Sequence, residues 1–268
     1  MNAEDVNYVR VNDIDLDKVV VSYKKVIEEN EKYYKKDRFF FATGEEVAEL
    51  KKSSKKTVSY MVKEFEMKKS ADAYARAMAE NLEGTLTQLF NLIWFCRRTN
   101  IPFEVFAFSN VYSKYNEMEL KREAGAFDID KFSMLNFFSS KMSTEEEMKM
   151  MHYVWMIANQ WGQRAWDIDG YPQRASAAYQ LGGTPLNEAI LAMIKIVPKF
   201  KNETGVQKVH SIFLTDGAGS SLTAKNEWQL NTYERSESYG EHVLSTTMIQ
   251  GKCVITDPVT NKTIKTED

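Results

Sequence analysis

The stretch "AAYQLGGTPLNEAILAMI", residues 177–194, decides how the second half of this chain is interpreted. Two glycines precede Thr184, and Pro185 follows it. Threonine is a preferred helix N-cap and proline a preferred first helical residue, so the stretch predicts a helix that begins here. The Thr184 hydroxyl is also an oxygen that a hard metal ion accepts as a ligand. Both interpretations, helix cap and metal ligand, remain open at this point.

The residues after Thr184 predict a helix followed by a strand. Apolar residues recur at helical spacing from Ala189 to Val197, and Pro198 is expected to end that helix. The run "VHSIFLTDGAGS", residues 209–220, is typical of a buried strand that leads into a glycine-rich turn. Asp216 would then lie just beyond the carboxyl end of that strand, where ligands bind in layered α/β folds. Its alternative role is that of a turn-forming aspartate before Gly217.

The middle of the chain predicts a further strand and two helices. "PFEVFAFSN", residues 102–110, has apolar residues on both faces apart from Glu104, which suits a strand covered by helices on either side. An amphipathic helix that ends near Arg98 precedes it, and residues 111–142 show no clean period, which indicates an irregular insertion. Ser143 and Glu146 have the spacing of a capping box. The helix behind them places four residues on one core-facing stripe: Met148, Met151, Trp155 and Ala158.

The N-terminal part of the chain is interpreted as helices. Apolar residues recur at helical spacing from Leu16 to Ile27, and "TGEE" at 43–46 suggests the start of a second helix. A third helix is expected from Val58 to Phe65. The basic "KKSSKK" at 51–56 is interpreted as a solvated face, because no aromatic residues are interleaved with its charges.

The C-terminal part of the chain is expected to contain little regular structure before its end. The segment after Asp216 is polar and turn-rich to about Gly240. Residues 253–268, "CVITDPVTNKTIKTED", predict a hairpin with its turn at Asp257, Pro258 or Asn261. No final strand and helix are expected to complete the layered sheet.

The composition is that of an ordinary globular protein. Among 268 residues, 43% are hydrophobic and 27% charged, and the formal net charge is -3. No overall positive field favours nucleic acid or anionic lipid, so neither is expected as a partner. Two distant cysteines, Cys96 and Cys253, do not suggest a disulfide framework. No signal peptide and no membrane-spanning run are recognised, and a cytoplasmic location is expected.

The pair "GGTPLNEAI" (182–190) and "IFLTDG" (212–217) resembles the von Willebrand factor A (VWA) domain. The nearest forms are the CobT-like subunit of cobaltochelatase and VWA partners of MoxR-like AAA+ ATPases, and phage-encoded VWA proteins are the most similar. "VSYMVKEFEMKKSADAYARA" (58–77) also resembles the segment that precedes the domain in CobT-like proteins. The resemblance implies a Rossmann-like α/β layer fold over 78–268, with an incomplete sheet, behind a helical N-terminal region, 1–77.

The resemblance also implies a metal site. Members of the family hold Mg²⁺ or Mn²⁺ with residues from three loops, and Thr184 and Asp216 match the second and third of these. The first motif, Asp-x-Ser-x-Ser, does not occur in the chain, and the simplest explanation is the loss of a strand and its turn between Ala77 and Met78. The expected function is protein binding with a MoxR- or CobS-like AAA+ ATPase, in metal insertion or protein remodelling. In the family, an acidic side chain of the protein ligand completes the metal's coordination.

Other chemistry is weakly indicated. His152, His210 and His242 lie in separate segments and do not form a zinc motif, and each is interpreted as a lone packed or surface residue. "FDID" (127–130) and "WDID" (166–169) offer paired carboxylates, although such pairs are common in solvated loops. A hydrolase with a peptidase-like site in 111–142 and 162–181 is one alternative function. A truncated product that binds little is another.

Overall fold

The computed structural model describes residues 7–10, 15–34, 38–68, 82–109, 126–127, 132–161, 184–215, 223–230, 242–248, 253–257 and 261–265. A three-stranded sheet lies at its centre, in the order β2 (Val20–Val21), β5 (Ser133–Ser139), β3 (Glu104–Ser109). β5 pairs parallel with β2 and antiparallel with β3, and the register with β3 shifts at Val105/Phe106. β3 confirms the predicted strand at 102–110. β5 corrects the interpretation of 111–142 as irregular.

β5 is the buried centre of this sheet. Six of its seven residues are buried, whereas every residue of β3 is only half-buried. The strand was overlooked because Ser133, Asn136 and Ser139 interrupt its apolar run. Hydrogen bonds from neighbouring groups allow such polar side chains to be buried.

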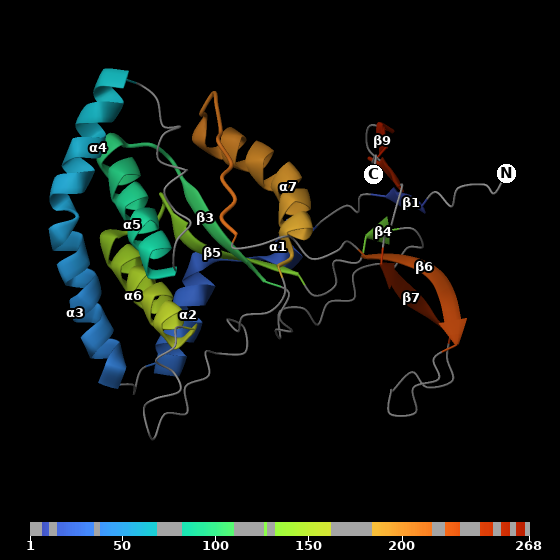
Figure 1. The fold of residues 1–268 in the computed structure, drawn as a ribbon, viewed down its shortest axis with the longest axis horizontal. Coiled ribbons are helices and arrows are strands. Elements are labelled where there is room, and N and C mark those ends of the chain that lie inside the picture. Colours follow the sequence, from blue (N-terminus) through green and yellow to red (C-terminus); the bar gives the residue numbers. More distant parts are fainter. Residues whose placement is uncertain are drawn as a thin grey trace.

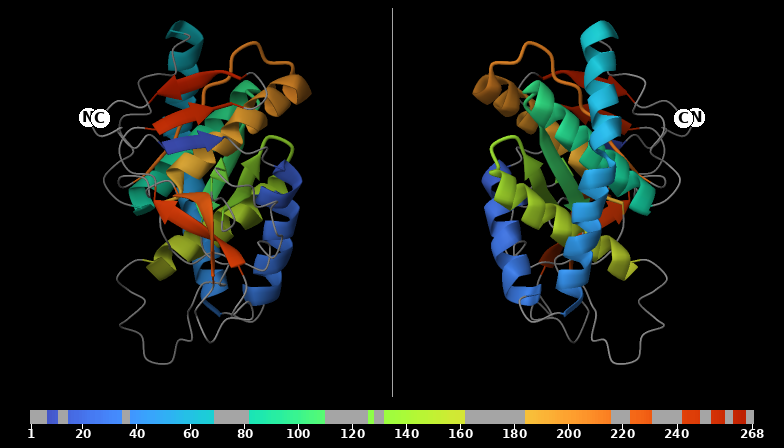
Figure 2. Two further views of the ribbon diagram at one scale, coloured as in Figure 1. Left: turned by 90° about the vertical axis from the view of Figure 1, so that its right-hand side faces the viewer. Right: turned by 90° about the vertical axis from the view of Figure 1, so that its left-hand side faces the viewer.

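Helices cover both faces of the sheet (Figures 1 and 2). Val105 and Ala107 of β3 pack into a cluster with α5 (Leu82–Thr99) and α6 (Thr144–Trp161). Phe106 and Phe108 pack on the opposite face, against α7 (Leu186–Thr204). The alternation of side chains along a strand therefore places one face of β3 in each of two cores. This arrangement confirms that helices lie on both sides of the predicted strand.

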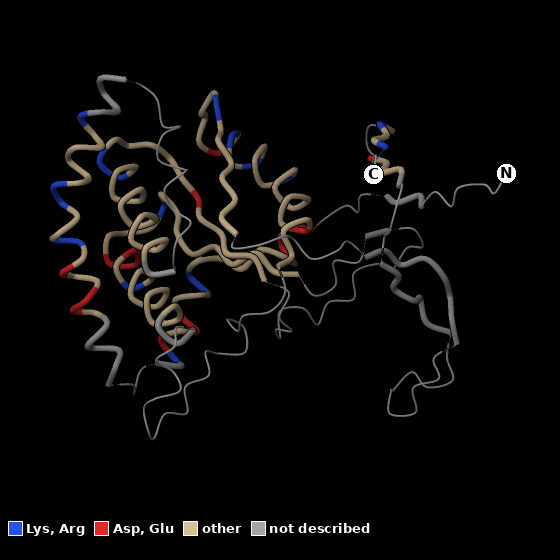
Figure 3. Tube along the Cα trace, in the orientation of Figure 1, with Lys and Arg blue, Asp and Glu red and all other residues tan. Residues whose placement is uncertain are grey.

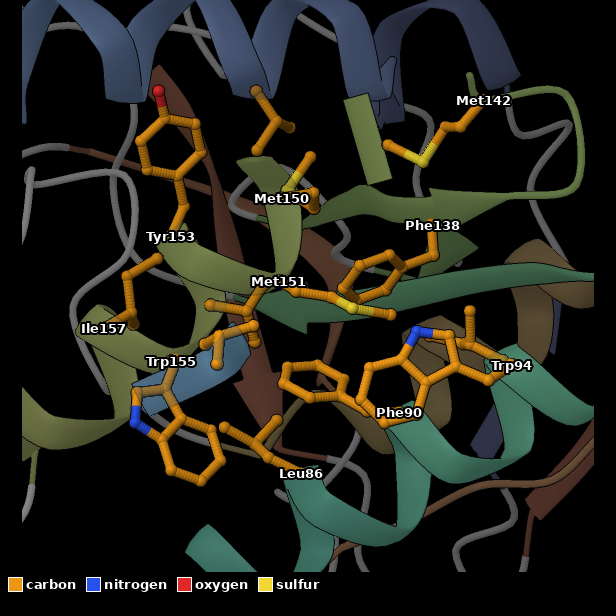
Figure 4. Packing of buried hydrophobic residues seen from close by; sticks show 14 of the residues in the cluster. Leu86, Phe90, Trp94, Phe138, Met142, Met150, Met151, Tyr153, Trp155 and Ile157 are labelled. Carbon is orange, nitrogen blue, oxygen red and sulfur yellow. The ribbon is translucent and has the colours of Figure 1, made fainter. Parts of the chain in front are cut away.

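The larger core lies between β5, α5 and α6 and is rich in aromatic and methionine side chains (Figure 4). Phe90 is fully buried, and its ring contacts those of Trp94, Phe138 and Trp155 at centroid distances of 5.9–6.1 Å. Met151 and Trp155 of the predicted stripe are buried here, and Met148 and Ala158 pack at its edge. The stripe is therefore core, as expected. Val26, Val47 and Val58 extend the same core into the N-terminal helices.

The N-terminal helices are α2 (Tyr23–Tyr34), α3 (Arg38–Ser53) and α4 (Lys55–Lys68). A short helix, α1 (Leu16–Val19), and β2 precede them, so the predicted single helix over 16–27 is wrong. Asp15 caps α1 by accepting a hydrogen bond from the Asp17 N–H at 3.1 Å. The predicted helix over 58–65 is confirmed by α4. Lys52, Lys55 and Lys56 are exposed, as expected for a solvated face, and Lys and Arg recur along this side (Figure 3).

α3 approaches α6 closely at a glycine. A Cβ atom at Gly44 would lie 3.0 Å from His152 Cε1, so a side chain there would require the His152 ring to shift slightly. The sequence "TGEE" does not start a helix, because α3 already begins at Arg38. Glu46 instead accepts a hydrogen bond from Trp155 Nε1 at 2.8 Å, which ties α3 to α6.

The two ends of α7 differ from expectation. Pro185 rather than Thr184 occupies the cap position, and Pro198 lies inside the helix instead of ending it. Pro198 has no N–H to donate to the carbonyl of Ile194 four residues earlier. Both residues are exposed, so the missing helical hydrogen bond lies on the solvent side. The helix ends at Gly205, whose left-handed backbone (φ 70°) lets its N–H donate to Lys201 O at 2.9 Å.

The segment after α7 is not a strand. Residues 205–215 form coil among the described residues, and Ile212, Phe213 and Leu214 are 55%, 36% and 38% exposed. The prediction of a buried strand over 209–215 is therefore wrong, because none of the described strands pairs with this segment. Asp216 and the turn that follows lie outside the described residues.

A second sheet has the order β7 (His242–Met248), β6 (Thr223–Leu230), β4 (Ala126–Phe127), β1 (Asn7–Arg10), β8 (Cys253–Thr256), β9 (Thr263–Lys265). β8 and β9 pair antiparallel, with Asn261 in the left-handed region (φ 52°), which confirms the predicted C-terminal hairpin. β6, which pairs with β7, corrects the expectation of a turn-rich segment up to Gly240. The chain is a mixed α/β protein. Among the described residues, no helix is both long and apolar enough to cross a membrane.

Arg97, at the end of α5, holds the turn between β5 and α6. Its Nε donates to buried Glu147 at 2.6 Å, and its two terminal nitrogens donate to backbone carbonyls. These carbonyls belong to Ser139 (3.2 Å), Ser140 (2.7 Å) and Met142 (2.7 Å). The guanidinium also lies 5.5 Å from the centre of the Phe103 ring. One side chain therefore joins α5, β5, α6 and the approach to β3.

Arg97→Ala is expected to lower the free energy of unfolding by about 3 kcal/mol, because it leaves the buried Glu147 carboxylate without its cation and removes the Arg97 donors from the carbonyls of Ser140 and Met142. Arg98→Ala is the matched control. Arg98 is exposed and donates to Ser59 Oγ, so its loss should cost less than about 1 kcal/mol. Urea unfolding followed by far-UV circular dichroism measures both values. Equal losses in the two variants would contradict the role given to Arg97.

The capping box at the start of α6 predicts a pH dependence. Ser143 N donates to Glu146 Oε2 at 2.8 Å, and Glu146 N donates to Ser143 Oγ at 3.2 Å, which confirms the sequence prediction. The Ser143 N–H lowers the pKa of Glu146 below its ordinary value of 4.5. A lowered pKa in the folded state means that the carboxylate stabilises the fold above pH 4.5 and loses this effect as the pH falls through the folded pKa.

The difference in unfolding free energy between the wild type and Glu146→Ala should therefore be complete at pH 7 and shrink steadily below pH 4.5. Thermal melts in a series of buffers measure it. A Glu146→Ala difference that does not depend on pH would contradict the cap.

Candidate functional site

The start of α7 carries Thr184, the first candidate site residue. Thr184 is half-buried, and its carbonyl accepts a hydrogen bond from Leu186 N at 2.8 Å, which turns the chain into the helix. Pro185 is fully buried, and its carbonyl accepts the first helical bond, from Ala189 N at 3.0 Å. Pro185 also has no side chain that can cap. Pro185 therefore occupies the cap position, and the metal-ligand interpretation of Thr184 stays a prediction.

The direction of α7 bears on what can lie near Thr184. In Figure 1, α7 begins toward the end of the sheet where β3 finishes, and it runs back toward the end where β3 begins. The coil that follows then returns in the opposite direction, with Thr215 as its last described residue. Asp216, the second candidate, comes next but lies outside the described residues. The distance between Thr184 and Asp216 therefore stays a prediction.

The remaining sequence candidates are separated or fall outside the described residues. His152 is buried in α6 and stacks on Tyr153 (6.3 Å, 7° between the rings), whereas His210 is exposed in coil. Both observations agree with lone packed and surface histidines. Phe127 ends β4, but the rest of "FDID" and all of "WDID" lie outside the described residues, as does the loop at 162–181. Within the described ranges, no three His, Cys, Asp or Glu side chains gather closely enough to hold a metal.

Cys96 is the one cysteine whose side-chain environment the described residues reveal, and it is not arranged as a nucleophile. It is a free thiol, partly buried against the larger core. This burial raises the pKa of the Cys96 thiol to about 11, so it stays protonated near neutral pH. The structure agrees with the expectation that Cys96 behaves as a small hydrophobic residue.

A polar cluster that the sequence analysis did not find lies between β3 and β5. Glu104 Oε1 accepts a hydrogen bond from Ser139 Oγ at 2.8 Å, and Oε2 accepts one from Asn136 Nδ2 at 2.6 Å. Ser139 and Asn136 are buried, and the Asn136 Oδ1 atom is buried without a hydrogen-bond partner. Lys141 Nζ donates a hydrogen bond to Glu203 of α7 at 2.6 Å, which raises the pKa of Lys141. The nearby negative charge of Glu104 raises this pKa further.

This cluster is better suited to holding strands together than to catalysis. Each carboxylate oxygen of Glu104 is held by a neutral donor, and both donors come from the neighbouring strand. A general acid or base would need a free oxygen that faces a substrate. The signal in the sequence was Glu104 itself, the lone charge in an apolar strand. Its two partners, Asn136 and Ser139, cannot be inferred from the sequence, because they lie on β5, whose apolar run is interrupted by polar residues.

Comparison of this chain with protein families, with curated proteins and with solved structures finds no match.

Glu104→Ala is expected to lower the unfolding free energy by about 1–3 kcal/mol, because Ser139 and Asn136 are left buried without their acceptor. Glu104→Gln should cost clearly less. After rotation of the Asn136 amide, a glutamine NH₂ can donate to the Oδ1 atom that has no partner in the wild type. Urea unfolding measures the order of the two variants. If Gln were as destabilising as Ala, the cluster would not hold the strands in this way.

Proposed function

We propose that this chain is a VWA-type protein-binding subunit that acts with an AAA+ ATPase of the MoxR or CobS type. The observation that carries the proposal is the ordered pair of motifs "GGTPLNEAI" and "IFLTDG", which place Thr184 before one helix and Asp216 after the next apolar run. Either motif alone is ordinary loop and helix-end chemistry. Their occurrence together, in the family's order, is much more specific.

The fold supports the proposal in part. An α/β layer with helices on both faces of β3 and β5 is the type of arrangement in which residues at loop ends meet a ligand. α7 follows Thr184 directly and packs on the sheet through Ala189, Ala192 and Ile196. The N–H groups at the N-terminus of α7 favour negatively charged ligands, so they disfavour a metal ion whose charge no carboxylate balances. A metal ion that binds there would need the carboxylate of Asp216 beside the Thr184 hydroxyl.

The proposed role is metal-linked binding rather than catalysis. Thr184 and Asp216 would supply two oxygens to Mg²⁺ or Mn²⁺, and water and an acidic side chain of the protein ligand would supply others. Because the Asp-x-Ser-x-Ser motif is missing, this is a degenerate form of the family's adhesion site, and its affinity for the metal alone would be low. Binding energy would then come mainly from the complex with the protein ligand. Insertion of a metal into a tetrapyrrole and remodelling of a protein are the two processes that this assembly would serve.

Metal binding by the isolated chain should appear as a rise in melting temperature in 5–10 mM Mg²⁺ relative to EDTA, by about 2–4 °C for each kcal/mol of binding free energy. Thr184→Val and Asp216→Asn keep the side-chain shapes but remove ligand oxygen or charge, so both should abolish the rise. Thr184→Ser retains the hydroxyl and should preserve it. A rise that persists in Asp216→Asn would refute the site. Hydrolysis of a peptide or nucleotide on addition of Mg²⁺ would favour the hydrolase alternative instead.

A further inference from the structure

The outer side of α3 and α4 carries a row of lysine side chains. The two helices form one nearly continuous rod (Figures 1 and 2), because helical hydrogen bonds cross their junction. Ser54 N donates to Leu50 O, and Val58 N donates to Ser54 O, both at 2.9 Å. Residues three, four or seven apart therefore lie along one side of the rod. Four exposed lysines occupy that side: Lys52, Lys55, Lys56 and Lys63.

A fifth cation joins this row from the neighbouring helix. Arg98, at the end of α5, is exposed, and its Nη1 donates to Ser59 Oγ at 2.7 Å. This bond holds the guanidinium beside the lysines. A guanidinium has five N–H donors, and the neutral Ser59 hydroxyl occupies one of them. We call these five cations the basic face: Lys52, Lys55, Lys56, Lys63 and Arg98.

Little negative charge balances the basic face. Lys52 pairs with Glu49 at 3.7 Å, and the two side chains are 79% and 70% exposed. Within the described ranges, the other three lysines of the face have no carboxylate partner. Lysines on other surfaces do have one, as in Lys32, Lys141 and Lys149. Positive charge that is concentrated in this way, on a chain of formal net charge -3, attracts negatively charged groups.

Tyr60 adds apolar area in the middle of the basic face. It is 60% exposed and lies about one turn from both Lys56 and Lys63 along the helix. Tyrosine is enriched at interaction surfaces, because its ring is apolar and its hydroxyl forms hydrogen bonds. The interpretation of 51–56 as a solvated face depends on the absence of interleaved aromatic residues. The helix brings Tyr60 to the same side as these lysines.

We propose that the basic face binds an acidic segment of a protein partner, rich in glutamate and aspartate. At about 1.5 Å per residue, the row from Lys52 to Lys63 is about 16 Å long, which matches about three turns of an acidic helix. Arg98 donates to one carboxylate through its remaining N–H groups, and the lysines contact others as point charges. The Tyr60 ring packs on an apolar residue of the same segment.

The charges that border the basic face favour a protein over a nucleic acid. The same side of the rod carries Glu45 and Glu49 before Lys52, so its charge changes sign along the axis (Figure 3). A phosphate backbone is negative along its whole length, and these two carboxylates repel it. A protein segment can place its acidic residues opposite the lysines and carry neutral or basic residues opposite Glu45 and Glu49.

This contact is separate from the proposed metal site, because neither Thr184 nor Asp216 belongs to the basic face. The acidic segment can bind whether or not Mg²⁺ is present. Loss of the metal response would therefore not affect this proposal, and failure of the acidic segment to bind would not affect the VWA proposal.

Fluorescence anisotropy of the full chain with two labelled probes of matched charge tests the partner's chemistry. One probe is a peptide of ten glutamates, and the other is a thymidine oligonucleotide with ten phosphates. The peptide should bind more tightly than the oligonucleotide at low salt, and its binding should weaken as added NaCl screens the charges. Tighter binding of the oligonucleotide, or no binding of the peptide at low salt, would overturn the proposal.

Charge reversal tests the location of the contact. Lys55→Glu, Lys56→Glu and Lys63→Glu together should raise the Kd of the peptide about tenfold or more, because three attractions become repulsions. The matched control reverses three exposed lysines on other parts of the chain and should weaken binding clearly less: Lys201→Glu, Lys208→Glu and Lys265→Glu. Both triple variants change the net charge equally, so equal weakening would refute the proposal.

Glutamine at the same three positions keeps the test valid if the reversed variant does not show native circular dichroism. Lys55→Gln, Lys56→Gln and Lys63→Gln remove the charges without adding repulsion, so the Kd of the peptide should still rise, by a smaller factor. A Kd equal to that of the wild type would contradict the assignment of the basic face.

Discussion

The contact between Arg97 and the turn that follows β5 is the interaction on which the central fold most depends. The guanidinium neutralises Glu147 and donates to three backbone carbonyls at the end of β5 and in the turn that follows it. A planar group with five N–H donors can do this, whereas a lysine at the same place could not. It also sets how α6 leaves the sheet. The aromatic core of Phe90, Trp94 and Phe138 lies between β5, α5 and α6, the three elements that Arg97 joins.

Strong local patterns in the sequence predicted their elements correctly. The apolar run at 102–110 became β3, the Ser143–Glu146 box starts α6, and the last hairpin forms as its turn residues indicate. These elements carry their determinants within a few residues. β5 does not, because Asn136 and Ser139 are stable inside it only through Glu104 on another strand. The run at 209–214 failed for the reverse reason, since its apolar residues find no strand to pair with.

The candidate site was predictable to a smaller extent. The sequence correctly singled out the beginning of α7, but the cap position falls on Pro185, which the sequence predicts as the first helical residue. A one-residue difference of this kind depends on the backbone angles of the turn, which composition and spacing do not determine. Glu104 was visible as an isolated charge, but its role depends on side chains about thirty residues away in the chain. Nothing local to "EVFAFS" encodes that contact.

The pairing of Val20 with Met134 has a consequence for how the chain reaches its folded form. β2 and α2 are synthesised long before β5. Val26 and Ile27, on the apolar side of α2, therefore stay unpacked until β5 is available. Closing so long a loop is entropically costly, and such contacts form slowly. β3 and β5 lie much closer together in the chain than β2 and β5 do, so they can meet first and offer a template. β2 and α2 are thus expected to dock after β3 and β5 have met, and until then their apolar residues are open to aggregation or to chaperone binding.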